Sequence, residues 1–226
     1  MRSTHSHGNI TWVDLENPTS EEVRTLIEER SIPALVAEEL LSPTLKPKVD
    51  LYPSCLYLIL HFPAFRHTHS RNASQEIDFV IGKDYIVTTR YDTVDPLHKF
   101  SKVFEVRSIL DRSDIGEHAG YVLFYMLRKL YRAVEHELEF LNDELRVIEA
   151  RIFNGQERDM VFALSRVQRT LLSFRQALRP HEEILESLER AGERFFGEEF
   201  RFHLKGISGE YFRVYSAIRS LGESLQ

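Results

Sequence analysis

The chain has 226 residues, of which 42% are apolar and 28% charged, a composition that suits one globular domain or a domain with an appended helical segment. The formal charge of −6 provides no overall attraction for nucleic acid, so we expect no nucleic-acid partner. The single cysteine, Cys55, excludes an internal disulfide and a cysteine-based zinc cluster, and no apolar run approaches the roughly 18 residues of a membrane helix.

The beginning of the chain predicts short elements of both kinds. Residues 11–15 form a β-like run, and Thr19 with Glu22 forms a capping box that starts a helix. A second, shorter helix is expected to follow Pro33 and to end at Leu41, because the prolines beyond it prevent continuation. The residues that the first helix is expected to bury are Val23, Leu26 and Ile27.

The next segments predict a layered domain. Residues 55–62 form a nearly continuous apolar run, which is typical of a strand covered on both faces. Residues 77–81 and 85–91 are predicted to pair as a hairpin, and residues 97–110 to form a third helix. Strands that alternate with helices favour an α+β fold, a layered α/β/α sandwich with a mixed sheet.

The second half of the chain has a helical period instead. Apolar residues at spacings of three and four form a sustained heptad seam, which predicts one straight helix of roughly 45 Å or more. The turn at 154–156 interrupts the seam before a second one begins, so the two helices should fold back as an antiparallel coiled-coil hairpin. Pro180 is expected to kink the second helix. The first seam contains Phe124, Leu127, Tyr131, Val134, Leu138, Leu141, Leu145, Ile148 and Ile152, and the second Met160, Leu164, Val167, Leu171, Phe174, Leu178, His181, Leu185 and Leu188.

A third seam begins at Ile207 and runs to Leu225. Because it stops in mid-heptad without a glycine stop or a polar tail, we expect its helix to lead into a further segment. The patterns divide the chain into an α/β domain (1–112), a long antiparallel helical hairpin (113–205) and the start of a third helix (206–226).

A set of short segments stands in a fixed order along the chain. They are residues 12–15, 17–19, 35–41, 46–50, 56–60, 81–88 with the turn Gly82-Lys83-Asp84, 121–124, 179–180 and 210–215. Taken together, they resemble the cytoplasmic domain of the CorA-type divalent-cation transporters. The resemblance covers nearly the whole chain from Thr11 on.

The resemblance implies a homopentamer in which each cytoplasmic α/β domain carries a helical hairpin and a stalk helix that enters the membrane. Two transmembrane helices with a Gly-Met-Asn signature would follow, and this sequence contains neither. The chain would then be the cytoplasmic regulatory domain of a transporter in the inner membrane, and it would catalyse no reaction. Its partners would be other subunits, the membrane, and a divalent cation such as Mg²⁺, Co²⁺ or Ni²⁺.

The resemblance also implies a regulatory metal site between neighbouring subunits, where bound Mg²⁺ holds the pore closed. The acidic pair of that site falls on Glu38 and Glu39, and oxygen ligands of this kind suit Mg²⁺. The opposing acids are expected at positions 213, on the stalk helix, and 128, on the first long helix. Arginines occupy both positions, Arg128 and Arg213.

Two interpretations of these arginines stay open. A guanidinium repels a divalent cation, so the sensor site should be weak or absent, and Arg213 or Arg128 would pair with Glu38 or Glu39 across the subunit boundary. Alternatively, all four are solvated surface charges without a role.

The remaining histidines give weaker signals. His67-Thr68-His69 could hold a transition metal, but no acid or cysteine joins them locally, so a polar loop is favoured. His5 and His7 lie in a polar terminal tail and are interpreted in the same way. His181 lies in an apolar seam and is interpreted as a core histidine, and Cys55 as a buried apolar residue.

Three alternatives to a CorA-like transporter remain. They are a zinc-exporting relative of the same superfamily, a freestanding scaffold protein that uses its helical hairpin as an arm, and a metal hydrolase that uses the loop histidines. Two apolar stretches of about 20 residues in the downstream reading frame would favour a transporter.

Overall fold

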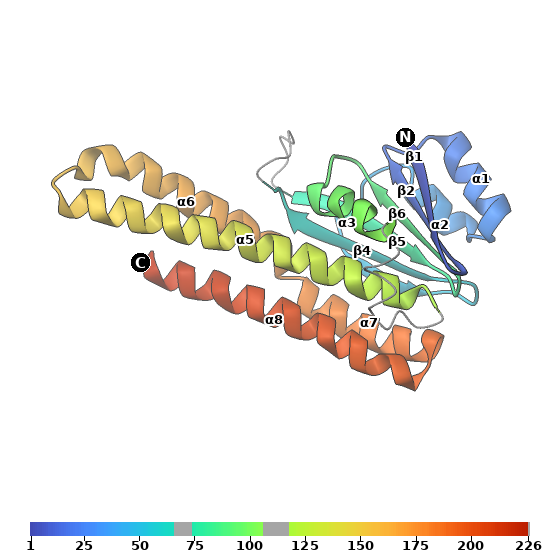
Figure 1. Cartoon of the computed structure of the whole chain (residues 1–226). Coiled ribbons are helices and arrows are strands. Elements are labelled where there is room, and N and C mark those ends of the chain that lie inside the picture. Colours follow the sequence, from blue (N-terminus) through green and yellow to red (C-terminus); the bar gives the residue numbers. More distant parts are fainter. Residues whose placement is uncertain (66–73, 106–117, 226) are drawn as a thin grey trace.

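The computed structural model describes residues 1–65, 74–105 and 118–225, apart from the side chains at 103, 105, 157 and 159. A body of sheet and short helices lies at one end, and long helices extend from it (Figure 1). The polypeptide therefore combines a layered domain with a helical extension, as the change of periodicity predicted.

Six strands form one mixed sheet in the order β1-β2-β6-β5-β4-β3. β2 and β6 run parallel, and every other neighbouring pair is antiparallel. The strands are β1 (Arg2–His7), β2 (Ile10–Glu16), β3 (Lys48–Leu51), β4 (Leu56–Pro63), β5 (Ser74–Ile81) and β6 (Tyr85–Arg90). The predicted mixed sheet and the predicted β5–β6 hairpin are confirmed.

Helices cover both faces of the sheet. Side chains alternate along β4, so that Leu58 packs in one apolar cluster with the long helices, and Ile59 packs in the other cluster with α1 and α2. The first layer is α1 (Ser20–Arg30) and α2 (Ala34–Glu39), and the second is α3 (Asp95–Glu105), α5 (Gly120–Phe153), α6 (Glu157–Leu178) and α7 (His181–Phe196). The predicted α/β/α layering is confirmed.

The capping box of α1 forms as predicted. The Thr19 hydroxyl accepts a hydrogen bond from the Glu22 amide at 3.2 Å, and the Glu22 carboxylate accepts one from the Thr19 amide at 3.0 Å. Val23 and Leu26 are buried, but Ile27 is 36% exposed because it lies at the edge of the stripe that faces the sheet. The expected burial of Ile27 is therefore wrong.

Two strands have no apolar signal in the sequence. β1 is polar, yet its backbone pairs with β2, and Gly8 adopts a φ of 58° at the turn between them. His5 lies in this strand, with its ring 4.9 Å from the Trp12 ring, so the predicted polar tail at His5 and His7 is wrong. β3 is the short strand at the opposite edge.

The two long seams form the predicted antiparallel hairpin. α5 has 34 residues and is about 51 Å long at 1.5 Å per residue. The chain reverses at Gly155, where φ is 81°, and α6 returns along α5. Pro180 separates α6 from α7, and both Arg179 and Pro180 keep right-handed helical dihedrals, which fits the predicted kink.

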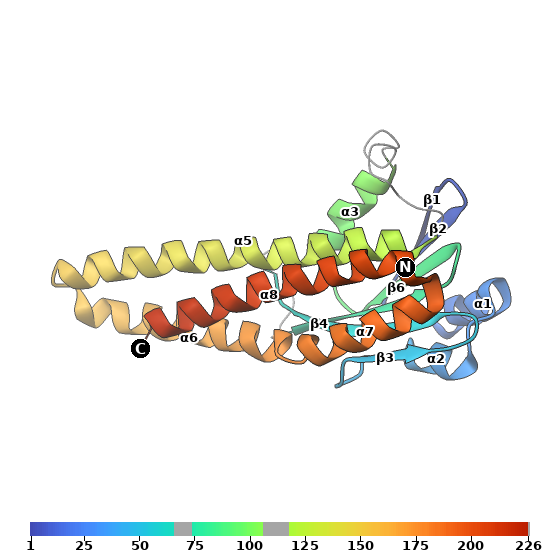
Figure 2. The ribbon, with the colours of Figure 1, turned by 90° about the horizontal axis from the view of Figure 1, so that it is seen from below.

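The last helix begins earlier than its seam suggests. After a 3₁₀ turn at Glu198–Phe200, α8 runs from Arg201 to Ser224 and packs along α5 and α7 (Figure 2). Gly206 lies inside α8, where a Cβ atom would come within 3.2 Å of the Phe124 ring. The glycine permits close packing there and does not loosen the helix. Among the described helices, none has both the length and the apolar composition that a bilayer crossing requires.

Candidate functional site

The acidic pair predicted from the sequence lies at the end of α2. Both oxygens of the Glu39 carboxylate contact Lys48 Nζ, at 2.9 and 2.7 Å, and Lys48 also pairs with Asp50 at 2.8 Å. Burial alone lowers the pKa of Lys48, but the bonds to Asp50 and Glu39 outweigh burial, so this pKa is raised. Glu39 is therefore neutralised within its own chain, whereas Glu38 is exposed and pairs with no described residue.

Exposed leucines surround Glu38. Leu35 is 58% exposed, Leu41 is 40% exposed, and Leu45 in the following loop is 98% exposed. Large apolar side chains gathered at the surface are typical of a protein–protein contact. We call Leu35, Glu38 and Leu41 the α2 patch.

The two predicted arginines come together between α5 and α8. Arg128 Nε donates to the Glu210 carboxylate at 3.0 Å, and Arg213 bonds the same carboxylate. Arg213 also pairs with Glu135 of α5, with 3.1 Å between Nε and Oε1. These four side chains form an ion-pair cluster that fastens α8 to α5. Within one chain neither arginine meets the α2 acids, because α2 lies on the other side of the sheet from α8 (Figure 1).

α8 also presents a basic, apolar face. Phe202 and Phe212 are 80% and 50% exposed. Lys205 and Arg213 lie in the same stripe, since residues three or four apart share one side of a helix. We call Phe202, Lys205, Phe212 and Arg213 the α8 face. It combines exposed rings with positive charge, whereas the α2 patch combines exposed leucines with negative charge.

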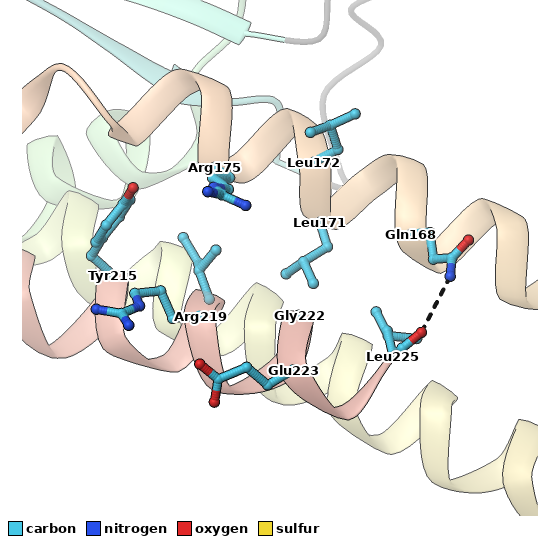
Figure 3. Close-up of a pocket in the computed structure, with 10 residues that line it drawn as sticks. Gln168, Leu171, Leu172, Arg175, Tyr215, Arg219, Gly222, Glu223 and Leu225 are labelled. Carbon is cyan, nitrogen blue, oxygen red and sulfur yellow. Dashed lines mark hydrogen bonds between the residues drawn. The ribbon is translucent and has the colours of Figure 1, made fainter.

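A groove of about 570 Å³ lies between α6 and α8. Figure 3 shows Arg175 and Arg219 on its two walls, and the Gln168 amide donating to the Leu225 carbonyl at 3.5 Å across its far end. Among the described lining residues Glu223 alone has a carboxylate, and two arginines face it, so this lining does not suit a cation. More generally, no three His, Cys, Asp or Glu side chains in the described ranges are placed to hold a metal. His67 and His69 lie outside the described residues.

His181 is a core residue, as predicted. Its ring is fully buried, with Nε2 donating to the His61 carbonyl at 2.9 Å and Nδ1 accepting from the Tyr131 hydroxyl at 2.8 Å. Burial lowers the pKa of His181 to about 4, so the ring is neutral near pH 7. The residue joins α7, α5 and β4 at the bend after Pro180.

Tyr131→Phe should lower the free energy of unfolding by about 1–3 kcal/mol, because it leaves the buried Nδ1 of His181 without a donor. Urea unfolding at pH 7 measures the change. Tyr125→Phe is the matched control on α5, since its hydroxyl makes no hydrogen bond to the part of the chain that the structure describes. It should change the free energy of unfolding by less than about 0.5 kcal/mol. Equal losses in both variants would contradict this role of Tyr131.

The structure adds two acidic residues that the sequence analysis did not single out. Glu76 and Asp78 lie buried on β5, and the Asp78 side chain is completely inaccessible. Burial, and then the charge of Glu76, raise the pKa of Asp78 well above its ordinary value. The signal was present in the sequence, because Asp78 interrupts the apolar run from Ile77 to Ile81 and Glu76 stands two residues before it.

Comparison with known proteins gives consistent matches along the chain. A protein-family model described as CorA-like Mg²⁺ transporter protein matches residues 7–226. Cobalt/magnesium transport proteins CorA from Thermotoga maritima and Methanocaldococcus jannaschii are each 22% identical over 184 residues, or 80% of this chain. Those matches cover 51% and 56% of the relatives, so the chain spans about half the length of the curated relatives it matches.

Solved structures share the fold. The complete CorA magnesium transporter from M. jannaschii has a TM-score of 0.80 at 19% identity, and the match covers 97% of this chain and 68% of that one. The ZntB cytoplasmic domain from Vibrio parahaemolyticus has a TM-score of 0.75 at 13% identity, and the match covers 97% of this chain and 84% of that one. At such identities the likeness establishes the fold alone.

Proposed function

The chain belongs to the CorA-like Mg²⁺ transporter protein family, and from this premise we propose that it is the cytoplasmic regulatory part of a divalent-cation transporter in the inner membrane. The family is one of ion transporters, so the chain is not an enzyme. The transported ion would be Mg²⁺, with Co²⁺ and Ni²⁺ as further candidates. The observation that carries the proposal is the family match, which spans the α/β domain, the hairpin and α8 in one alignment.

The subunits would assemble head to tail as a homopentamer. The α2 patch and the α8 face differ from each other, and the helices that carry them, α2 and α8, lie on opposite sides of the sheet (Figure 1). A contact between two different patches is heterologous, and repeated around an axis it closes a ring. Opposite charges and exposed apolar side chains on the two surfaces make them complementary.

Arginine would replace a bound metal ion at this boundary. Arg213 bonds Glu210 and Glu135 and stays half exposed, with guanidinium donors left for the Glu38 carboxylate of the next subunit. Because a guanidinium repels a divalent cation, assembly and gating would depend little on Mg²⁺. The contact would act mechanically, since the packing of neighbouring α/β domains would set the position of α8 and hence of the pore.

A zinc-transporting relative is the second candidate, because the ZntB domain shares the fold. Ion flux into liposomes that contain the complete transporter distinguishes the two. Uptake of Mg²⁺ in preference to Zn²⁺ supports the first proposal, and the reverse preference supports the second. The scaffold and hydrolase alternatives lose their support with the family assignment.

Removing apolar side chains from either surface should weaken self-association. Leu35→Ser and Phe212→Ser should each raise the dissociation constant at least about tenfold, since burying such a side chain contributes about 1.5–3 kcal/mol. Sedimentation velocity across a concentration series measures the effect. Phe153→Ser is the control, because Phe153 is 89% exposed at the hairpin tip, outside both surfaces. If that control weakens assembly equally, the assignment of the surfaces is wrong.

A further inference from the structure

Glu76 and Asp78 form a pair of buried carboxyl groups on β5. They lie two residues apart, so both point to the face of the sheet covered by α1 and α2. Burial, and next the charge of Glu76, raise the pKa of Asp78, so each carboxyl acts on the other. Two ionised carboxylates in contact repel each other strongly when water is excluded, so such pairs retain one proton.

The donors around the pair are distributed unequally. The Glu76 carboxylate accepts from the Thr44 amide, at 2.9 and 2.7 Å from its two oxygens, and contacts His61 Nε2 at 3.1 Å. Asp78 Oδ2 accepts from the Tyr91 hydroxyl at 3.0 Å, but Asp78 Oδ1 has no donor among the described residues. A buried oxygen without a donor is costly, and a proton held between the two carboxyls removes that cost.

Among the described residues, no cation balances the charge of an ionised Asp78. Lys48 is engaged by Glu39 and Asp50, and His61 contacts Glu76. The buried hydroxyl of Tyr57 likewise has no partner in the described part of the chain. The titratable and charged groups that face the pair are Glu39 of α2, Lys48 and Asp50 of β3, Tyr57 and His61 of β4, and Tyr91 after β6.

The same pair holds the segment that follows α2. The Tyr91 hydroxyl, which bonds Asp78, also lies 3.4 Å from the carbonyl of Glu39, the last residue of α2. Glu76 holds the amide of Thr44, farther along the loop. Glu76 therefore fixes the Thr44 end of residues 39–44 to the sheet directly, and Tyr91, which donates to Asp78, lies beside the Glu39 end.

We propose that Glu76 and Asp78 share a single proton, and that this proton locks residues 39–44 onto the sheet. When the O–H bond breaks and the proton passes to water, two adjacent anions remain. Their repulsion is relieved when the segment lifts and water enters. An effect of this opening on the subunit contact of the α2 patch rests on the proposed function. The shared proton and the opening of residues 39–44 do not rest on it.

The direction of the pH effect follows from the raised pKa of Asp78. In the closed form residues 39–44 lie on the sheet, and in the open form they have lifted from it. The closed form binds the proton more tightly, so it is favoured at low pH and lost as pH rises. The opening constant is the ratio of the open form to the closed form. At pH values between the ordinary pKa of a carboxyl group and the raised pKa of Asp78, this ratio should increase about tenfold per pH unit. Above the raised pKa it should level off.

Asp78→Asn tests the lock, because its side-chain amide is neutral at every pH and can donate to Glu76. Amide hydrogen exchange of Thr44, corrected for intrinsic rates, should accelerate with pH in the unsubstituted chain and stay flat in Asp78→Asn. Asp84→Asn, in the exposed β5–β6 turn, is the matched control and should behave like the unsubstituted chain.

Infrared spectroscopy detects the proton directly in the unsubstituted chain, so its main result does not depend on the folding of a variant. The unsubstituted chain at pH 7 should show the carbonyl band of a protonated carboxyl, and Asp78→Asn should remove it. Absence of that band from the unsubstituted chain, or a corrected Thr44 rate that does not change with pH, would overturn the proposal. Neither result would affect the proposed subunit contact, which sedimentation tests separately.

Discussion

A chain carrying Asp14→Ala should lose about 3–5 kcal/mol of its free energy of unfolding, because the change removes the buried counter-ion of the Arg90 guanidinium and leaves it the more exposed Glu16 instead. Asp14 Oδ2 accepts from Arg90 at 3.2 and 3.1 Å, and Oδ1 accepts from the Thr88 hydroxyl at 2.6 Å. Both charged side chains are almost completely buried. The Trp12 indole N–H extends this network by donating to Thr88 at 2.9 Å.

The network joins β2 to β6, the one parallel pair among the described strands of the sheet. Urea unfolding at pH 7 measures the loss. Glu16→Ala is the matched control, because Glu16 contacts the same guanidinium at 3.1 Å but is more exposed, and it should cost at most about 1 kcal/mol. Similar small losses in the two variants would show that the buried pair is not the source of stability.

Glu38→Arg should weaken self-association by about a hundredfold. In the proposed ring Glu38 faces Lys205 and Arg213 of the next subunit, and like charges brought together at a contact cost several kcal/mol. The substitution should not alter the fold, since Glu38 is exposed and pairs with no described residue. Sedimentation across a concentration series measures the dissociation constant, with circular dichroism to verify folding.

Glu28→Arg is the control for charge alone. It makes the same change of charge on the exposed side of α1, away from the α2 patch, and should leave the dissociation constant within about twofold. If both variants weaken assembly equally, net charge and not the proposed contact explains the effect. If neither does, Glu38 is a solvated surface charge.

The spacing of apolar residues predicted the long helices well, because the residues at that spacing are the ones that the helices bury. Leu138, Leu141 and Leu145 repeat at heptad spacing in α5, and all three are buried against neighbouring helices. The polar strand β1 could not be predicted in this way, since backbone pairing with β2 holds it and its side chains carry no apolar pattern.

The candidate site was predictable in its positions but not in its pairings. Glu210 and Arg213 lie one helical turn apart, so their bond could be read from spacing alone. Arg128 and Glu135 join them only because α5 packs on α8, and Lys48 neutralises Glu39 only because β3 passes beside α2. Whether Glu38 meets Arg213 of another subunit stays a prediction.

Limited proteolysis of the assembled chain, with and without Mg²⁺, tests the central claim most directly. If arginine replaces the metal at the subunit boundary, the rate and pattern of cleavage should be the same in both conditions, and Glu38→Gln should increase cleavage in both. Strong protection that requires Mg²⁺ and disappears in Glu38→Gln and Glu39→Gln would contradict the claim. It would show that the carboxylates bind the cation despite Arg128 and Arg213.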